Sequence, residues 1–431
     1  MAPCVSVIIA TYQWSRALRC ALRSVLLQTL QDFEVLVIGD GCTDDSEAVV
    51  RSFGDARLSW HNLPENSGSQ SAPNNRGFVL STGRTIAYLG HDDIWYPTHL
   101  QSLVETIGRR RADLAYAVSI IYGSAESGMR FVMGLLGEDG YTEHDFLPPS
   151  SILLTRELLE RLGPWRAPSE LSVPIDYDVL RRALRAGAVF AGTGQLTVFK
   201  FNAAFRRDVY LTKDTGDQEA TLARIEAGAD FRQEEWAALV RCFLTGRSWA
   251  TTVPEALDQM APGAIHARNL QFKGIAPAQV YPRLDRTLHV DLREDTPGFE
   301  WHLLESLEPF GSFRWSGPSR KSSILLPVPA DQAVAITVKI LFAVTPATLA
   351  GLRVFLNGAA TTATLDRQPD GSFLLRTRHA GHTVPEGRPG GLLLTLEVPR
   401  TVSFSQLGQS SDTRPVGIAV NWVEAKPIAP G

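Results

Sequence analysis

The stretch Val5-Ser6-Val7-Ile8-Ile9-Ala10-Thr11-Tyr12 is a continuous apolar run that ends in polar residues. Such a run is typical of a strand that is buried on both faces of a sheet. Apolar residues at helical spacing follow it directly: Ala17, Leu18, Ala21, Leu22, Val25 and Leu26. A buried strand followed by an amphipathic helix is the repeating unit of an α/β fold.

The same alternation of strand and helix patterns continues to about residue 90. Further strands are expected over Glu34–Ile38, Leu58–Asn62 and Thr85–Leu89. Helices over Ser46–Phe53 and Asn74–Leu80 separate them. We therefore predict a mostly parallel sheet with helices on both faces, in which ligands bind at the carboxyl ends of the strands.

The sequence pattern changes twice along the chain, which predicts three parts. Residues 1–210 form the α/β domain, residues 211–296 a helical connector and linker, and residues 297–431 an antiparallel β-sandwich. The last part contains seven short β-rich runs: Ser323–Val328, Val334–Val344, Leu352–Leu356, Ala359–Leu365, Phe373–Thr377, Leu392–Val398 and Val416–Val423. Asn357-Gly358 between two of these runs is a strong signal for a two-residue hairpin.

Composition and charge are those of an ordinary globular protein. The 431 residues include 42 Lys and Arg against 46 Asp and Glu, so neither nucleic-acid binding nor a disordered tail is expected. No apolar run reaches the roughly 18 residues that a transmembrane helix needs, and the N-terminal segment reads as a strand and not as a signal peptide. The four cysteines show no paired spacing, which favours a reducing, cytoplasmic environment.

Polar residues follow three of the expected strands, and these loops should meet at one edge of the sheet. They are Thr11-Tyr12, Asp40 to Asp45, and Gly90-His91-Asp92-Asp93. An aromatic ring, a carboxylate and a carboxylate pair suit a nucleoside diphosphate, whose clustered negative charge calls for a hard cation with oxygen ligands. Asp44-Asp45 is an acidic pair better explained as a helix cap, and capping is also the alternative for Asp93.

The ordered set of these motifs resembles the family 2 glycosyltransferases, over residues 3–210. The set consists of the first strand and its Thr11-Tyr12, Ser24 to Thr29 with Asp32 to Val35, Gly39 to Asp44, and Tyr88 to Asp93. The resemblance implies a GT-A fold with a Rossmann-like sheet. It also implies that Thr11, Tyr12, Asp40 and Asp92 bind the nucleotide and that Asp93 holds Mg²⁺ or Mn²⁺ on the diphosphate.

A second acidic cluster, Asp176-Tyr177-Asp178, opens an expected helix. By the same resemblance Asp176 is the catalytic base, since an acceptor hydroxyl must lose its proton as the new bond forms. The alternative is favourable placement of both carboxylates in the first turn of a helix. We assign Asp178 to that structural role.

The chain departs from the family pattern at four positions. Gly39 and Gly90 stand where acidic residues are usual, Asn74 stands where arginine is usual, and Ile175 replaces the usual glutamate before the base. Phe199-Lys200-Phe201 and Arg206-Arg207 could bring cations towards the diphosphate, although charges near a domain edge are usually solvated. His91 has hydrogen bonding as its expected role, not metal ligation.

The resemblance implies an inverting, metal-dependent transferase that moves a sugar from a nucleoside diphosphate donor, with UDP favoured, to a glycan acceptor in bacterial surface polysaccharide synthesis. The protein could lie at the inner face of the membrane and form homo-oligomers through its C-terminal domain. The alternative is a catalytically silent glycan-binding or scaffold protein. A nucleotidyltransferase is disfavoured because the loop from Ala10 to Arg16 has no glycine.

Overall fold

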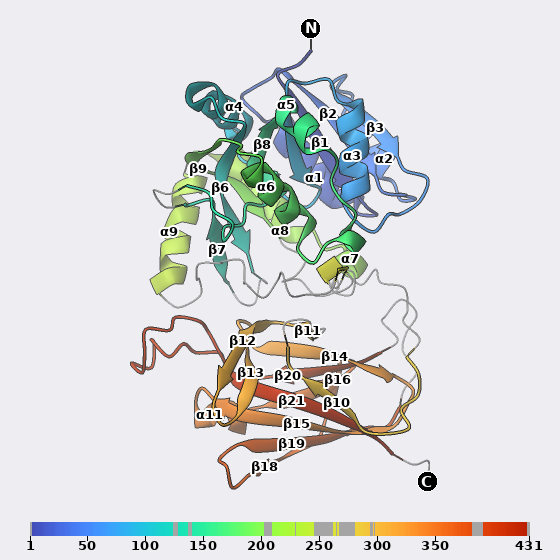
Figure 1. Cartoon of the computed structure of the whole chain (residues 1–431), viewed down its shortest axis with the longest axis vertical. Coiled ribbons are helices and arrows are strands. Elements are labelled where there is room, and N and C mark those ends of the chain that lie inside the picture. The colour runs from blue at the N-terminus through green and yellow to red at the C-terminus, as the bar shows by residue number, and fades with distance from the viewer. Residues whose placement is uncertain are drawn as a thin grey trace.

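Two domains of different class make up the described chain (Figure 1). The computed structural model describes residues 2–123, 128–136, 140–201, 209–228, 230–244, 262–263, 265–266, 281–293, 296, 298–381 and 391–428. The N-terminal domain holds one mixed, mostly parallel sheet with helices, and the C-terminal domain holds two antiparallel sheets. Both predicted fold classes are confirmed.

The predicted parallel strands form one half of the N-terminal sheet. They are β1 (Val5–Thr11), β2 (Phe33–Gly39), β3 (Leu58–Asn62) and β4 (Thr85–Gly90). Their order is β3-β2-β1-β4, with every neighbouring pair parallel. The bounds agree with the prediction to within one residue. β1, β2 and β4 are mostly apolar and buried and end at polar loops, whereas β3 is a partly exposed edge strand with alternating polar residues.

The second half of the sheet contains five strands, most of which the sequence pattern does not reveal. They are β5 (Ile94–Trp95), β6 (Leu114–Tyr122), β7 (Arg130–Met133), β8 (Ile152–Thr155) and β9 (Phe190–Lys200). β8 lies antiparallel between β4 and β6, and β6 pairs in parallel with β9. β9 also pairs with β5, so its last residue, Lys200, reaches the loop that follows β4.

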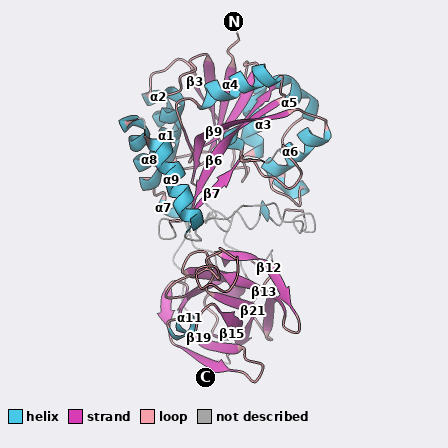
Figure 2. Cartoon of the chain, turned by 90° about the vertical axis from the view of Figure 1, so that its left-hand side faces the viewer, coloured by secondary structure: helices cyan, strands magenta, loops and turns pink. Residues whose placement is uncertain are grey.

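Helices cover both faces of this sheet (Figure 2). The α-helices are α1 (Ser15–Leu26), α2 (Ser46–Ser52), α3 (Ser71–Leu80), α4 (His99–Arg110), α5 (Arg156–Leu162) and α6 (Ile175–Arg185), and the 3-10 turns are Pro149–Ser151 and Pro168–Glu170. Apolar side chains of α1, α2 and α4 pack on one face, and those of α3, α5 and α6 on the other. Alternate residues of each strand supply the two cores.

Three more helices, α7 (Val209–Thr212), α8 (Gly216–Ala227) and α9 (Phe231–Leu244), follow the sheet. Ion pairs Arg16–Glu219 and Arg23–Glu226 join α1 to α8, and α9 packs against β7. The described helices of the expected connector therefore lie against the N-terminal sheet. Residues 245–261, 264 and 267–280 of that connector lie outside the described residues.

The C-terminal domain is a two-sheet sandwich around one apolar core. Its first sheet contains β10 (Leu288–Asp291), β12 (Trp301–Leu307), β13 (Gly311–Ser316), β15 (Val334–Ala343), β18 (Ala363–Arg367), β19 (Phe373–His379) and β21 (Ile418–Pro427). The second contains β11 (Gly298–Phe299), β14 (Lys321–Pro329), β16 (Arg353–Leu356), β17 (Ala359–Thr361) and β20 (Gly391–Glu397). A short helix, α11 (Pro346–Ala350), follows β15.

The predicted hairpin at Asn357-Gly358 is present between β16 and β17. Both residues have positive φ, 48° and 85°, as a type I′ turn requires. The expected strand Ala359–Leu365 divides at Thr362, because β17 pairs within one sheet and β18 within the other. None of the described helices is both long and apolar enough to span a bilayer.

Candidate nucleotide and catalytic site

The strand register brings three predicted loops together at one edge of the N-terminal sheet. Thr11 at the end of β1 pairs with Gly39 of β2, and Ala10 pairs with Gly90 of β4. Asp40 and the Gly90–Asp93 loop therefore flank the end of β1 on opposite sides. This is the edge at which open parallel sheets bind ligands.

His91 ties the first and last of these loops together. Its Nδ1 lies 2.9 Å from the Thr11 hydroxyl and accepts the Tyr12 backbone N–H at 3.3 Å. Because a backbone N–H can only donate, neutral His91 carries its proton on Nε2, which lies 3.1 Å from the Tyr210 hydroxyl. Thr11 and His91 are buried, whereas Tyr12 is partly exposed at the edge and available to a base.

Asp40 is a buried carboxylate at the end of β2. Its Oδ1 accepts the Ser67 backbone N–H at 2.9 Å, which fixes its orientation towards the loop before α3. Beside it, a Cβ at Gly39 would lie 2.4 Å from Asn62 Oδ1 and 2.7 Å from the Trp60 ring. Side chains of β3 thus fill the space where the resemblance leads one to expect an acidic residue.

Asp93 is fully buried and already engaged within the protein. Its Oδ2 accepts the Ser150 hydroxyl at 2.5 Å and forms an ion pair with Lys200 Nζ at 2.8 Å. Its Oδ1 accepts the Phe201 backbone N–H at 3.3 Å. Burial raises the pKa of Asp93 above its ordinary value, and the Lys200 ammonium opposes this rise without cancelling it.

Gly90 leaves room for the two carboxylates of this loop. A Cβ at this position would lie 2.8 Å from Asp93 Oδ2 and 3.2 Å from Asp92 Oδ1. The two oxygens therefore converge on one small volume. Asp92 is partly exposed, so its carboxylate is the more accessible of the two.

Asp176 lies in the first turn of α6 and is partly exposed. Its Oδ1 accepts the Tyr177 backbone N–H at 3.0 Å, and within the described residues its Oδ2 has no hydrogen-bond partner. Burial raises the pKa of Asp176, and the charge of Lys200 opposes the rise. A raised pKa means that this carboxylate takes up a proton more readily, which suits a group that has to accept one from a substrate.

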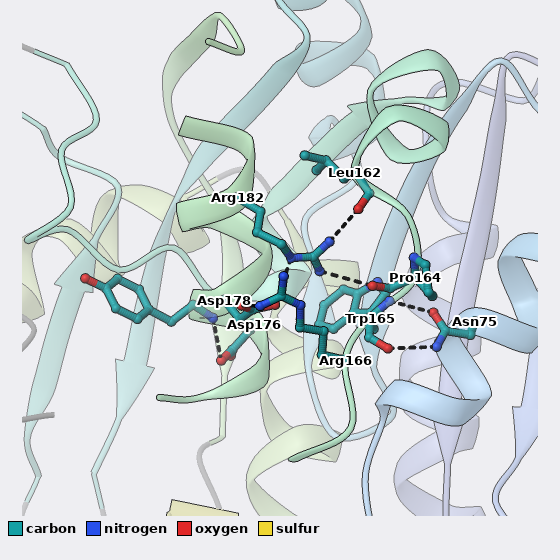
Figure 3. Close-up of polar contacts among 9 residues, drawn as sticks. Asn75, Leu162, Pro164, Trp165, Arg166, Asp176, Asp178 and Arg182 are labelled. Carbon is teal, nitrogen blue, oxygen red and sulfur yellow. Dashed lines mark hydrogen bonds and ion pairs between the residues drawn. The ribbon is translucent and has the colours of Figure 1, made fainter. Parts of the chain in front are cut away.

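Asp178 is held differently from Asp176, although both open the same helix (Figure 3). Its carboxylate pairs with Arg182 at 2.9 Å and with Arg166 at 3.4 Å. Arg182 also donates to the carbonyl oxygens of Leu162 and Pro164. Asp178 therefore anchors the segment before α6, in keeping with the structural role expected for it.

Asn75, which follows Asn74 in α3, forms two hydrogen bonds with the backbone of Trp165. Its Oδ1 accepts the Trp165 N–H at 2.8 Å, and its Nδ2 donates to the Trp165 carbonyl at 2.9 Å (Figure 3). Asn74 is buried, and its Nδ2 has no partner among the described residues. Neither side chain supplies the positive charge of the arginine that the resemblance implies.

Ser150 is a site residue that the sequence did not single out, and Lys200 is one of the cations that the sequence placed within possible reach of the diphosphate. Lys200 interacts electrostatically with Asp92, Asp93 and Asp176, and Ser150 links Asp93 to the backbone of Gly90. The one sequence signal for Lys200 is its place between Phe199 and Phe201 in an otherwise apolar run. Arg206 and Arg207 lie outside the described residues.

The oxygen atoms at the edge fit a small, hard cation such as Mg²⁺ or Mn²⁺. The observation is the convergence of Asp92 Oδ1 and Asp93 Oδ2 around Gly90, since such ions need one or two carboxylates and take further ligands from phosphates and water. Within the described part of the chain no three His, Cys, Asp or Glu side chains cluster to form a complete cage. The cation would therefore have to share Asp93 with Lys200.

Comparisons with known proteins agree with the sequence resemblance. Residues 6–157 match the family model described as Glycosyl transferase family 2. An uncharacterized glycosyltransferase of Nostoc sp. is 37% identical over 102 residues, 23% of this chain and 32% of the relative. One of Rickettsia bellii is 33% identical over 165 residues, 38% of this chain and 21% of the relative. The chain thus spans about a third or less of the length of these two relatives.

A solved structure is also similar. The crystal structure of S. aureus TarS residues 1–349 aligns with 66% of this chain and 95% of that chain, at 16% sequence identity and a TM-score of 0.39.

Proposed function

Because the N-terminal part of this chain is a family 2 glycosyltransferase domain, we propose that it transfers a sugar from a nucleoside diphosphate donor to a hydroxyl of a glycan acceptor. The proposal is supported by two observations: Asp40 and the Asp92-Asp93 pair follow the strands on either side of β1 at one sheet edge, and Lys200 interacts electrostatically with Asp92, Asp93 and Asp176. The acceptor we propose is a growing bacterial surface glycan, and UDP is the nucleotide to test first.

In this proposal each loop has its own task. Tyr12 stacks beside the base, Asp40 accepts from the base or the ribose, and Thr11 holds the strand end through His91. Asp92 and Asp93 would hold the divalent cation, which would supply neutralising charge to the leaving diphosphate.

Asp176 acts as the base. Its Oδ2, which has no hydrogen-bond partner among the residues that the structure describes, can accept the proton of the attacking hydroxyl while its Oδ1 stays bound to the Tyr177 N–H. The oxygen of the acceptor forms the new bond to the anomeric carbon as the bond to the diphosphate breaks. A single displacement of this kind inverts the anomeric configuration.

The test combines binding and transfer. UDP, dTDP, GDP and CDP are titrated calorimetrically with and without Mn²⁺, and transfer from the matching sugar donor is then followed for wild type and Asp176→Asn. We expect the variant to bind the nucleotide normally and to lose transfer by roughly 100-fold or more, the usual contribution of a positioned base.

The matched control is Glu157→Gln, which removes an exposed carboxylate from the first turn of α5. It reproduces the loss of one charge at a helix N-terminus and should leave transfer unchanged. Failure of every nucleotide to bind under either condition would overturn the proposal.

The engagement of Asp93 by Lys200 favours one second candidate, a site that binds a ligand without catalysis. The same experiment separates the two functions. Nucleotide binding without transfer from any donor, in wild type as in Asp176→Asn, would support the silent alternative.

A further inference from the structure

We propose that Lys200 is a built-in cation of the donor site, which holds Asp93 before the donor binds and then contributes its ammonium to binding the diphosphate. The inference rests on the proposed function, because it names how the same site handles the donor's charge. It adds a positively charged side chain that the sequence resemblance does not assign.

The contacts of Lys200 suit this role better than a purely structural one. Its Nζ lies 2.8 Å from Asp93 Oδ2, and the Lys200 side chain is 21% exposed while that of Asp93 is fully buried. The ammonium has three N–H groups, and Asp93 is its one hydrogen-bond partner within the described residues. Two N–H groups therefore remain for a ligand at the exposed side of the pair.

The single positive charge of Lys200 does not neutralise the carboxylates around it. Asp93, Asp92 and Asp176 all interact electrostatically with the ammonium. Three carboxylates against one ammonium leave the cluster negative, so it can take up a divalent cation as well. Because Lys200 and that cation would share Asp93, each weakens the hold of the other on this carboxylate.

The backbone on both sides of Lys200 is fixed, which preorganises the ammonium. Phe199 pairs with Ile94 of β5, and the Phe201 N–H donates to Asp93 Oδ1. The Phe201 ring stacks on Tyr122 with 5.1 Å between centroids. A cation held in place before the ligand arrives binds a diphosphate at a lower entropic cost than a free side chain.

The first arm of the test measures nucleoside diphosphate binding in EDTA. UDP, dTDP, GDP and CDP are titrated into wild type, Lys200→Met, which keeps the apolar stem, and Lys200→Arg, which keeps the charge. We expect wild type to retain metal-free binding of the preferred nucleotide, Lys200→Met to bind it roughly tenfold or more weakly, and Lys200→Arg to lie between them. Lys321→Met, an exposed lysine of the sandwich, is the control.

The second arm measures Mn²⁺ alone. Removal of the competing ammonium should tighten Mn²⁺ binding of Lys200→Met by roughly tenfold relative to wild type. If the role of Lys200 were purely structural, its replacement would change neither the dissociation constant of the nucleotide in EDTA nor that of Mn²⁺. If the thermal melt shows that Lys200→Met does not fold, Lys200→Arg is used in its place. We then expect the ratio of the nucleotide dissociation constants measured without and with Mn²⁺ to differ from that of wild type.

The outcomes separate this inference from the proposed function. Nucleotide binding that requires Mn²⁺ in wild type, with Mn²⁺ affinity unchanged in Lys200→Met, would overturn the role of Lys200 and leave the transferase intact. Binding of no nucleotide under any condition would overturn the proposed function itself.

Discussion

Gly90 and Gly39 are single residues whose lack of a side chain shapes the site. Neighbouring side chains occupy the space that a side chain at either position would need. At Gly90 these are the carboxylates of Asp92 and Asp93, and at Gly39 they are Asn62 and Trp60. The departures from the family pattern at these glycines are therefore compensated locally. The consequence for Gly90 can be tested directly.

We expect Gly90→Ala to weaken Mn²⁺-supported nucleotide binding by roughly tenfold or more, a cost of about 1.4 kcal/mol. The new Cβ would lie 2.8 Å from Asp93 Oδ2, and Asp93 cannot retreat because Ser150 and Lys200 hold it. Calorimetric titration measures the effect. Gly108→Ala in α4, where a Cβ meets no atom within 4 Å, should leave binding unchanged and stabilise its helix by up to about 1 kcal/mol. Normal binding by Gly90→Ala would contradict the expected crowding.

The sequence could place Asp40, Asp93 and Asp176 near strand ends or a helix start, because local patterns decide those positions. It could not show that Asp93 is fully buried and ion-paired, since Lys200 lies 107 residues away along the chain. Nor could it show that Trp95 and Trp165 are both buried, so that neither ring is exposed as a surface on which a sugar could stack. Polar contacts between distant segments are set by the register of β9, and no local pattern reports that register.

At the scale of elements, a buried carboxylate joins α8 and α9 to the sheet. Glu235 of α9 accepts hydrogen bonds from the Tyr122 hydroxyl of β6 at 2.9 Å, from Arg130 of β7 at 3.0 Å and from Arg224 of α8 at 2.7 Å. Tyr122 in turn stacks on Phe201 beside Lys200. The network thus connects the helices that follow the sheet to the edge that carries the site.

We expect Glu235→Ala to lower the free energy of unfolding by about 1–3 kcal/mol, because it removes the buried carboxylate that the partly buried Arg130 guanidinium and the Tyr122 hydroxyl share. Arg224 is more exposed and keeps its ion pair with Glu234. Glu234→Ala, which removes an exposed partner of the same Arg224, should cost less than about 1 kcal/mol. Urea denaturation followed by tryptophan fluorescence measures both. Equal, small losses for the two variants would show that the Glu235 network adds little stability.

The Glu235 carboxylate also makes the free energy of unfolding depend on pH, and the direction of that dependence follows from its pKa. Burial raises the pKa of Glu235, but the hydrogen bonds and charges of Arg130 and Arg224 outweigh it, so the pKa of Glu235 falls below the ordinary value for glutamate. A group with a depressed pKa in the folded state stabilises the protein above its unfolded pKa and loses that contribution as the pH falls. We expect the wild-type advantage over Glu235→Gln, measured by urea denaturation, to shrink below about pH 4.5. A constant difference across that range would contradict the assignment.

The elements that the sequence predicted well are those with a clear hydrophobic period or a specific turn signal. β1 to β4 alternate with helices in regular order, and the Asn357-Gly358 turn has its own chemistry. β6 is a continuous apolar run, which periodicity alone does not distinguish from a buried helix. The division of Ala359–Leu365 between two sheets depends on pairing partners at either side of Thr362, so it becomes visible only in three dimensions.

At the scale of the whole molecule, the two domains have separate cores among the described residues. The clusters of the α/β domain draw on residues up to Leu239, and those of the sandwich begin at Leu284. Each part exceeds the length of about 100 residues at which a single core supports independent folding. Every residue assigned to the nucleotide or the base lies in the first part.

We therefore expect a fragment of residues 1–244 to fold and to bind the preferred nucleotide with a Kd within about threefold of the full chain, a difference below about 1 kcal/mol. All of its site contacts, including those of Lys200 and the Glu235 network, lie inside that range. A fragment of residues 281–431 should unfold separately in one cooperative transition, because its two sheets close on one core. Calorimetric titration and urea denaturation measure these properties. If the first fragment is folded but binds no nucleotide that the full chain binds, the sandwich completes the donor site; if only glycan transfer is lost, the sandwich acts on the acceptor.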